Sequence, residues 1–311
     1  MNLLVMHPYA NECKKRLESK FPEVTMFFAT DEEEIGDFAG KAEILYTLRP
    51  SDELIKRCKK LKWIQSIITG TDFIVNLPSM RKEILVTSTT GVHGPQMSEM
   101  AFLLMLALNR NFPQVVLNQN QKVWDRWPGK LLWQKKVCIL GLGVIGKEVA
   151  RKCKAFGMTV YGIEIIQDRI DYVDHLYGPE KLLDVLPEID YLVDILPNTA
   201  GTRKFIGAKE FSAMKPTAYF LNIGRGETVD EEALSEALET GKIAGAALDV
   251  FMKEPLPENS PLWDARNLII TPHVGGMSDI YLDQAFPIFE ENLSRYLKGE
   301  RKDLVNVIAH G

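Results

Sequence analysis

A glycine pattern near the middle of the chain constrains the fold most. The apolar run Val137–Leu140 leads into Gly141-Leu-Gly-Val-Ile-Gly146, and a helix-like segment follows. In a dinucleotide-binding βαβ unit, the first glycine permits the tight turn, the second lets the backbone approach a pyrophosphate, and the third lets helix and strand pack closely. A second expected strand, Thr159–Ile163, is followed by Glu164, where such units place an acid for the ribose hydroxyls. The pattern predicts a dinucleotide site; the alternative is a glycine turn that binds nothing.

Length and charge limit the other classes of protein. The chain has 311 residues, of which 46% are hydrophobic and 25% charged, and its formal net charge is −5. This length allows about two domains of ordinary size, each with its own core. A negative balance argues against a nucleic-acid partner, because binding to phosphates needs a basic surface.

The cysteines and the apolar segments bear on location. The four cysteines have no CxxC spacing and therefore predict neither a metal site nor a disulfide framework: Cys13, Cys58, Cys138 and Cys153. The start, Met1–Met6, lacks the basic region of a signal peptide. The longest apolar helix candidate, Met97–Leu108, carries Glu99 and is too short to span a bilayer. We therefore expect a cytoplasmic protein without membrane contact.

Short apolar runs alternate with helical patterns twice along the chain, which predicts an α/β protein with two domains built on parallel sheets. The strands expected in the first part are 3–6, 24–28, 44–47, 63–68 and 84–87, with helices at 13–20 and 51–60. The strands expected in the second part are 136–140, 159–163, 191–195, 218–222, 244–250 and 268–270.

Two long helices are expected to join these parts. One runs from Gln96 to about Asn120 with a kink at Pro113, and the other spans 278–298, after which Leu304–Val307 adds a last strand to the first domain. We therefore predict a discontinuous first domain made of residues 1–94 and 280–311. Residues 95–279 form an inserted NAD-binding domain with a doubly wound parallel sheet.

Three chemically capable residues follow strands of the second domain. Arg225 lies between glycines, Glu254 lies in a proline-rich loop, and His273 precedes two glycines. Ligands of open α/β sheets bind outside the carboxyl ends of the strands. Arginine binds carboxylates bidentately, and histidine exchanges protons near neutral pH. Together they indicate hydride transfer to or from a 2-hydroxy or 2-keto acid. Taken alone, each has a structural alternative: Arg225 as part of an ion pair, Glu254 as an ordinary loop acid and His273 as a structural hydrogen-bonding residue. The remaining histidines follow no strand of this domain: His7, His93, His175 and His310.

The sequence resembles the D-isomer-specific 2-hydroxyacid dehydrogenase family over essentially its whole length. The resemblance rests on five motifs in a characteristic order. They are Gly141–Gly146, Leu196–Thr199 with Thr202, Asn222–Gly226, Ala247–Phe251 with Glu254–Pro257, and Thr271–Gly276.

This resemblance implies two Rossmann-like domains, a flavodoxin-like substrate domain (1–94 and 280–311) and the inserted NAD-binding domain (95–279). It also implies roles for particular residues. His273 exchanges a proton with the substrate oxygen, Glu254 pairs with His273, and Arg225 binds the substrate carboxylate and carbonyl. Thr69 and Gly70 lie in a loop whose backbone amides hold the substrate carboxylate. Besides Gly141, Gly143 and Gly146 of the glycine motif, the implied cofactor contacts are Val144, Ile145, Glu164, Leu196, Pro197, Thr202, Ile223, Gly224, Asp249 and Gly275 or Gly276.

The resemblance also implies a small substrate, such as glyoxylate, hydroxypyruvate or pyruvate, and a homodimer. Formate dehydrogenases of this fold pair their histidine with glutamine, so Glu254 favours hydroxy or keto acid chemistry. Glu164 favours NAD over NADP, because a carboxylate repels a 2′-phosphate, although Arg169 lies nearby. Two alternatives are an NAD(H)-sensing regulatory protein on the same scaffold and a phosphite dehydrogenase.

A cluster of tryptophans precedes the glycine motif, namely Trp124, Trp127 and Trp133. In some relatives, a tryptophan from this region reaches the active site of the partner subunit. Packing at a dimer interface or on the domain surface explains the cluster equally well, and both interpretations stay open at this point.

Overall fold

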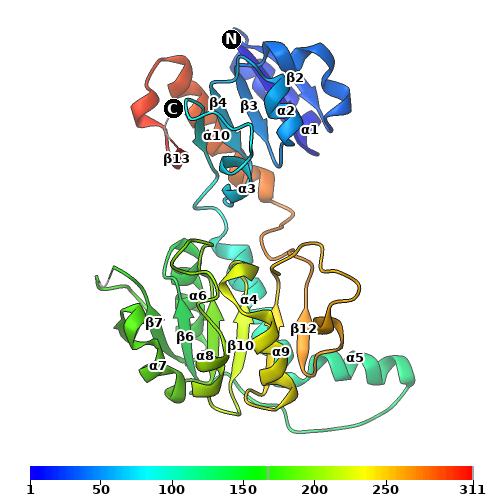
Figure 1. Ribbon diagram of the computed structural model, residues 1–311, viewed down its shortest axis with the longest axis vertical. Coiled ribbons are helices and arrows are strands. Elements are labelled where there is room, and N and C mark those ends of the chain that lie inside the picture. The colour runs from blue at the N-terminus through cyan, green and yellow to red at the C-terminus, as the bar shows by residue number, and fades with distance from the viewer. Residues whose placement is uncertain (167, 310–311) are drawn as a thin grey trace. The chain divides into compact units, whose positions relative to one another are not determined.

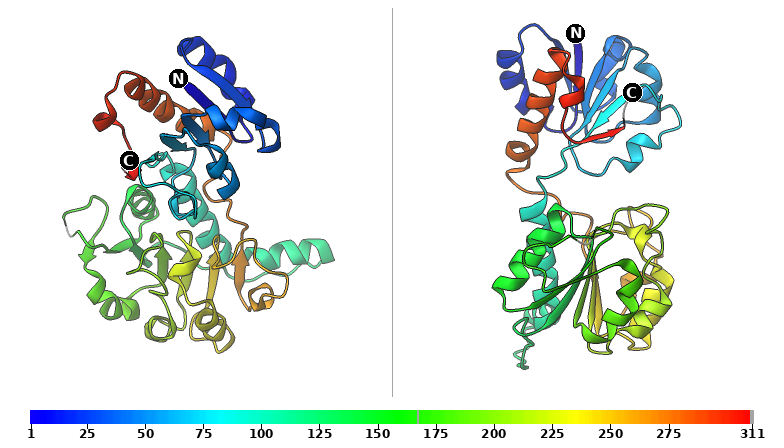
Figure 2. Two further views of the ribbon diagram at one scale, coloured as in Figure 1. Left: turned by 45° about the horizontal axis from the view of Figure 1, so that its top comes forward. Right: turned by 90° about the vertical axis from the view of Figure 1, so that its left-hand side faces the viewer.

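The computed structural model describes residues 1–166 and 168–309, so His310 lies outside the described residues. The chain forms two compact units, which we call the terminal unit (Met1–Val92 with Ser278–Gly311) and the inserted unit (His93–Met277). Each contains one sheet with helices on both of its faces (Figures 1 and 2). The predicted α/β class with two Rossmann-like domains is confirmed.

The terminal unit has a six-stranded sheet with the order β13-β5-β4-β3-β1-β2. Its strands are β1 (Asn2–Met6), β2 (Thr25–Ala29), β3 (Ile44–Thr47), β4 (Trp63–Ser66), β5 (Leu85–Thr87) and β13 (Val307–Ala309). Only β13 is antiparallel to its neighbour. Its helices are α1 (Ala10–Lys20), α2 (Asp52–Arg57), α3 (Asp72–Val75) and α10 (Tyr281–Leu297), with 3-10 segments η1 (Glu33–Lys41) and η6 (Arg301–Asp303).

Stacked aromatic rings attach α10 to this sheet. Phe289 of α10 stacks on Tyr46 of β3 with ring centroids 4.0 Å apart, and Tyr296 stacks on Trp63 of β4 at 4.8 Å. Large buried rings of this kind supply much of the apolar area removed from water on folding. The C-terminal segment is therefore part of the same core as the first 92 residues.

The inserted unit has seven parallel strands with the order β12-β11-β10-β9-β6-β7-β8. They are β6 (Lys136–Leu140), β7 (Thr159–Ile163), β8 (His175–Tyr177), β9 (Tyr191–Asp194), β10 (Tyr219–Asn222), β11 (Gly245–Leu248) and β12 (Leu268–Ile270). One face packs against α4 (Gly94–Arg110) and α6 (Val144–Ala155). The other packs against α7 (Leu182–Val185), α8 (Ala208–Ala213) and α9 (Glu231–Glu239). Short 3-10 segments are η2 (Pro179–Lys181), η3 (Leu186–Glu188), η4 (Gly226–Thr228) and η5 (Pro261–Asp264).

The prediction of one long helix kinked at Pro113 is wrong. Two helices, α4 and α5 (Phe112–Gln121), meet at Asn111, whose φ of 49° is left-handed, and their axes bend by 64°. Asparagine tolerates this conformation better than most residues. Pro113 lies in the first turn of α5, where its missing N–H breaks no helical hydrogen bond.

The last strand also begins later than expected. We predicted Leu304–Val307, whereas β13 starts at Val307. Asn306 has a φ of 57°, so the backbone is not extended before that point. Leu304 is buried in the core without being part of a strand.

Within the described ranges, no single helix is long and apolar enough to cross a bilayer. The bent pair α4 and α5 meets that criterion by length and composition. Most of α4 is nevertheless buried in the inserted unit, with Ala101, Leu104 and Met105 packed into its core.

Candidate active site

A histidine and a glutamate form a hydrogen-bonded pair at the carboxyl edge of the inserted sheet. Nδ1 of His273, which follows β12, lies 2.7 Å from Oε2 of Glu254, which follows β11. The other carboxylate oxygen of Glu254 accepts the Phe251 N–H at 3.0 Å. The two side chains are 40% and 28% exposed, so a ligand can reach them. A carboxylate at Nδ1 orients the ring, so Nε2 is the nitrogen that is available to a ligand.

A buried carboxylate fixes the loop that carries His273. Asp249, just after β11, accepts hydrogen bonds from the Thr271 hydroxyl (2.5 Å) and from the backbone N–H groups of Val274 (3.1 Å) and Gly275 (2.9 Å). A Cβ on Gly275 would lie 2.7 Å from Oδ2 of Asp249, so this bond needs glycine. The loop is thereby held on both sides of His273, whose φ is 53°. The cofactor contact that we predict for Asp249 stays a prediction.

Arg225 lies in the loop after β10, which is held by the side chain of Asn222. Oδ1 of Asn222 accepts the Gly224 N–H at 2.9 Å, and Nδ2 donates to the Arg225 carbonyl at 2.9 Å. Nη1 of Arg225 donates to the Gly224 carbonyl at 2.7 Å. A Cβ on Gly226 would lie 1.9 Å from the carbonyl carbon of Phe251. The loop of Arg225 therefore contacts the loop of Glu254 at backbone distance.

The glycine motif has the geometry expected of a dinucleotide site. Gly141 has a φ of 87°, which glycine adopts without strain, and a Cβ on Gly146 would lie 2.1 Å from the Gly141 carbonyl oxygen. A Cβ on Gly143 would meet nothing within 4 Å, and α6 begins at the next residue. The space over Gly143 is thus open at the positive end of a twelve-residue helix, where a pyrophosphate fits.

Glu164 lies at the end of β7, beside this motif. Its two carboxylate oxygens accept the N–H groups of Leu142 and Ile165, each at 2.8 Å. A carboxylate oxygen has more than one acceptor direction, so Glu164 retains the capacity to bind ribose hydroxyls. The residues of this edge therefore fit a dinucleotide.

The other predicted cofactor contacts also follow strand ends of the inserted unit. Thr202 donates to the Pro197 carbonyl at 2.5 Å, which closes the loop after β9. The structure places these residues in the first turn of α6 (Val144 and Ile145), after β9 (Leu196, Pro197 and Thr202), after β10 (Ile223 and Gly224) and after β12 (Gly275 and Gly276).

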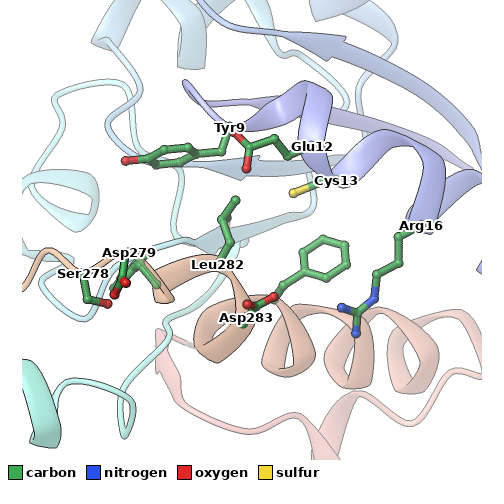
Figure 3. Close-up of a pocket in the computed structure, with 10 residues that line it drawn as sticks. Tyr9, Glu12, Cys13, Arg16, Ser278, Asp279, Leu282 and Asp283 are labelled. Atoms are coloured by element: carbon green, nitrogen blue, oxygen red, sulfur yellow. The ribbon is translucent and has the colours of Figure 1, made fainter.

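The predicted substrate loop belongs to the terminal unit. Thr69 and Gly70 lie between β4 and α3, where the Ser66 hydroxyl donates to the Ile68 carbonyl at 3.0 Å. The same unit has a pocket of about 300 Å³ between α1 and α10 (Figure 3). Cys13 and Leu282 line it, and it contains neither Thr69 nor Gly70. No cluster of three or more potential metal ligands occurs in the described part of the chain.

The sequence analysis missed two residues that bear on this site, His93 and Asp194. His93 is buried at the start of α4, beside Gly276. Burial, with the charge of Arg225 as the second cause, lowers the pKa of His93 to about 4. His93 is therefore neutral at pH 7. Asp194 ends β9 and is fully buried. Its position as a charged residue inside the apolar run 191–195 is the sequence feature that could have indicated a buried acid.

Comparisons with known proteins identify the family of this chain. Residues 102–275 match the family model described as D-isomer specific 2-hydroxyacid dehydrogenase, NAD binding domain. D-3-phosphoglycerate dehydrogenase of Methanocaldococcus jannaschii is 33% identical over 99% of this chain, which spans 60% of that protein's length. Glyoxylate/hydroxypyruvate reductase A of Serratia proteamaculans is 31% identical, over 89% of this chain and 90% of that protein.

Solved structures give the same result. A D-isomer specific 2-hydroxyacid dehydrogenase family protein from Aeromonas salmonicida is similar with a TM-score of 0.90 and 33% identity, covering 99% of this chain and 98% of that one. Other structures with this fold contain NADP or NAD. The chain belongs to the D-isomer specific 2-hydroxyacid dehydrogenase family, as its sequence motifs predicted.

The open space over Gly143 generates a prediction. Gly143→Ala is expected to weaken NADH binding at least about tenfold, because the new methyl group occupies the space of the pyrophosphate, and to leave the melting temperature nearly unchanged. Gly40→Ala is the matched control, since its Cβ also meets nothing within 4 Å but lies in the terminal unit. Titration of NADH fluorescence measures the NADH affinity of each variant. Equal affinities of Gly143→Ala and Gly40→Ala would contradict the assignment.

Proposed function

We propose that the protein is an NAD-dependent D-2-hydroxyacid dehydrogenase that reduces small 2-keto acids such as glyoxylate, hydroxypyruvate and pyruvate. The pair of His273 and Glu254, at 2.7 Å, carries this proposal, because it is a proton-exchange device one loop away from a carboxylate-binding arginine. The glyoxylate/hydroxypyruvate reductase among the relatives supports the substrate class. It also favours a keto acid reductase over a dinucleotide sensor or a phosphite dehydrogenase.

Each residue has a definite part in the reaction. Arg225 binds the substrate carboxylate and polarises the carbonyl to be reduced. When bound, the reduced nicotinamide dinucleotide supplies the hydride. His273 donates its Nε2 proton to the carbonyl oxygen, and Glu254 stabilises the imidazolium before that transfer. In the direction of oxidation, neutral His273 accepts the proton of the hydroxyl group.

Replacing the proton donor tests this assignment. His273→Ala is expected to lower kcat for every accepted keto acid by about 10² to 10⁴-fold and to leave NADH binding intact, because only the proton donor is lost. Glu254→Gln keeps the shape but removes the charge, so a smaller loss in kcat is expected. NADH oxidation with glyoxylate, hydroxypyruvate, pyruvate and oxaloacetate measures both effects. The matched control is His175→Ala, an exposed histidine at the start of β8. Full activity of His273→Ala would reject the assignment.

We further propose that NAD is the preferred dinucleotide. Glu164 is held beside the glycine motif by the Leu142 N–H, so its negative charge faces the expected ribose position. A carboxylate accepts hydrogen bonds from ribose hydroxyls and repels a 2′-phosphate.

This preference has a direct kinetic consequence. With the best keto acid, kcat/KM for NADH is expected to exceed that for NADPH by at least about tenfold, and Glu164→Gln is expected to reduce the ratio. Parallel steady-state assays with the two dinucleotides measure it. A clear advantage of NADPH in the wild-type protein would contradict the proposal.

A homodimer is the proposed oligomeric state. Helix α5 extends from the inserted unit (Figure 1), and its side chains Phe112 and Leu117 are 53% and 51% exposed. Trp124 and Trp133, on the segment that follows, are 92% and 60% exposed. Exposed apolar surface of this extent is typical of a protein–protein interface. Trp127 donates its indole N–H to the carbonyl of Arg110 at 3.3 Å, so its ring is held on its own subunit here.

The mass in solution tests the dimer. Sedimentation equilibrium is expected to give twice the 35.2 kDa of one chain. Charged residues on α5, introduced together as Val116→Asp and Leu117→Asp, are expected to give single chains with an unchanged circular dichroism spectrum. Tyr172→Asp is the control, because it also places a charge at an exposed apolar position. A wild-type mass of one chain would refute the dimer.

We also place the protein in the cytoplasm. All four cysteines are buried free thiols, which is typical of proteins from a reducing compartment. Cell fractionation checks this placement, and recovery from the culture medium would contradict it.

A further inference from the structure

Asp194 is a buried acid that the proposed reaction does not use. It ends β9 and is 0% exposed. Its Oδ1 accepts the Leu196 N–H at 2.9 Å, and its Oδ2 lies 2.6 Å from the hydroxyl oxygen of Thr228 in η4. Burying a carboxyl group is costly unless it is well hydrogen-bonded or neutral. The protonation state of Asp194 therefore depends on what these two contacts supply.

The contacts of Thr228 determine where the protons lie. Its hydroxyl oxygen is 2.6 Å from Oδ2 of Asp194 and also 2.6 Å from the carbonyl oxygen of Arg225. Both distances are those of O–H···O hydrogen bonds, and each such bond needs its own proton. A hydroxyl group has one proton, and a backbone carbonyl and an ionised carboxylate have none. Both bonds can therefore form together only when Asp194 carries the second proton.

The surroundings of Asp194 agree with a protonated carboxyl group. Its neighbours in the sheet are uncharged, Leu140 on β6 and Asn222 on β10, and Thr228 faces it from η4. The cation of this loop, Arg225, directs its Nη1 to the Gly224 carbonyl. Burial raises the pKa of Asp194 to about 6, although the bonds from Thr228 and Leu196 partly oppose the rise.

We propose that Asp194 is a positioning residue for Arg225: its carboxylic acid donates a hydrogen bond to the Thr228 hydroxyl, which in turn donates a hydrogen bond to the Arg225 carbonyl. This inference rests on the proposed function, in which Arg225 holds the keto acid. When Asp194 loses its proton, Thr228 donates to the carboxylate instead. The Arg225 carbonyl then keeps the bonds from Asn222 at 2.9 Å and from the Thr228 N–H at 3.3 Å, and loses its shortest one. Asp194 also holds Leu196, so one carboxyl group joins the loop of the expected cofactor to the loop of the substrate anchor.

Three variants separate this role from a merely structural one. Asp194→Asn imitates the protonated acid, because its amide donates to Thr228 and its oxygen accepts from Leu196. Asp194→Leu removes both bonds, and Thr228→Val breaks the relay in its middle. The controls are Asp184→Asn and Thr240→Val, which change the same groups at exposed positions of the inserted unit.

The kinetic readout is the KM for the keto acid as a function of pH. In the wild type, KM is expected to rise about five- to tenfold as the pH increases through about 6, with a smaller change in kcat, because the Arg225 carbonyl loses its shortest hydrogen bond, the one from the Thr228 hydroxyl. Asp194→Asn is expected to keep the low KM throughout. Thr228→Val and Asp194→Leu are expected to show the high KM at every pH. A pH dependence of KM in Asp194→Asn equal to that of the wild type would overturn the proposal.

An infrared measurement gives a second readout without turnover. At a pH of about 5, exposed carboxyl groups are largely ionised, so a protonated buried acid gives a distinct carbonyl band. We expect this band in the wild type and its loss in Asp194→Asn. Identical spectra of the wild type and Asp194→Asn would overturn the proposal, even if the enzyme is fully active. Absence of any keto acid turnover, with the band present, would instead reject the proposed function and leave the proton on Asp194 established.

Discussion

The active site depends on the close approach of three loop backbones at one edge of a parallel sheet. Strands β9, β10 and β11 are neighbours, so the loops that leave their carboxyl ends share one space. A Cβ on Gly224 would lie 2.8 Å from the Leu196 carbonyl oxygen, and one on Gly226 would lie 1.9 Å from the carbonyl carbon of Phe251. Glycine alone permits both approaches. They place Arg225 between the loop of the expected cofactor and the loop of Glu254.

Carboxyl groups then fix these loops before any ligand binds. Asp249 binds both sides of the histidine loop, Asp194 binds the loop after β9, and Glu254 binds the Phe251 N–H as well as the ring of His273. A site whose donors and acceptors are already oriented requires little reorganisation during the reaction. The side chains that we propose for the chemistry therefore lie on loops that hydrogen bonds hold in place.

Much of this architecture could be predicted from the sequence, because its signals are local. The glycine motif, the acid after the second strand and the three residues at strand ends each lie within a few residues of an apolar run. The misses have local causes too: β8 has only three residues, and the break at Asn111 was obscured by Pro113. The relay of Asp194 was beyond sequence reasoning, because Thr228 lies 34 residues away and meets it only in the folded sheet.

The central claim is that these loops assemble a site for hydride transfer to a 2-keto acid. Transfer of label from NADH deuterated at C4 of the nicotinamide tests it most directly, with mass spectrometry of the product formed from pyruvate or hydroxypyruvate. The account predicts one deuterium atom at C2 of a D-2-hydroxy acid in the wild type and almost none with His273→Ala. Tight binding of the dinucleotide without label in any hydroxy acid would contradict it.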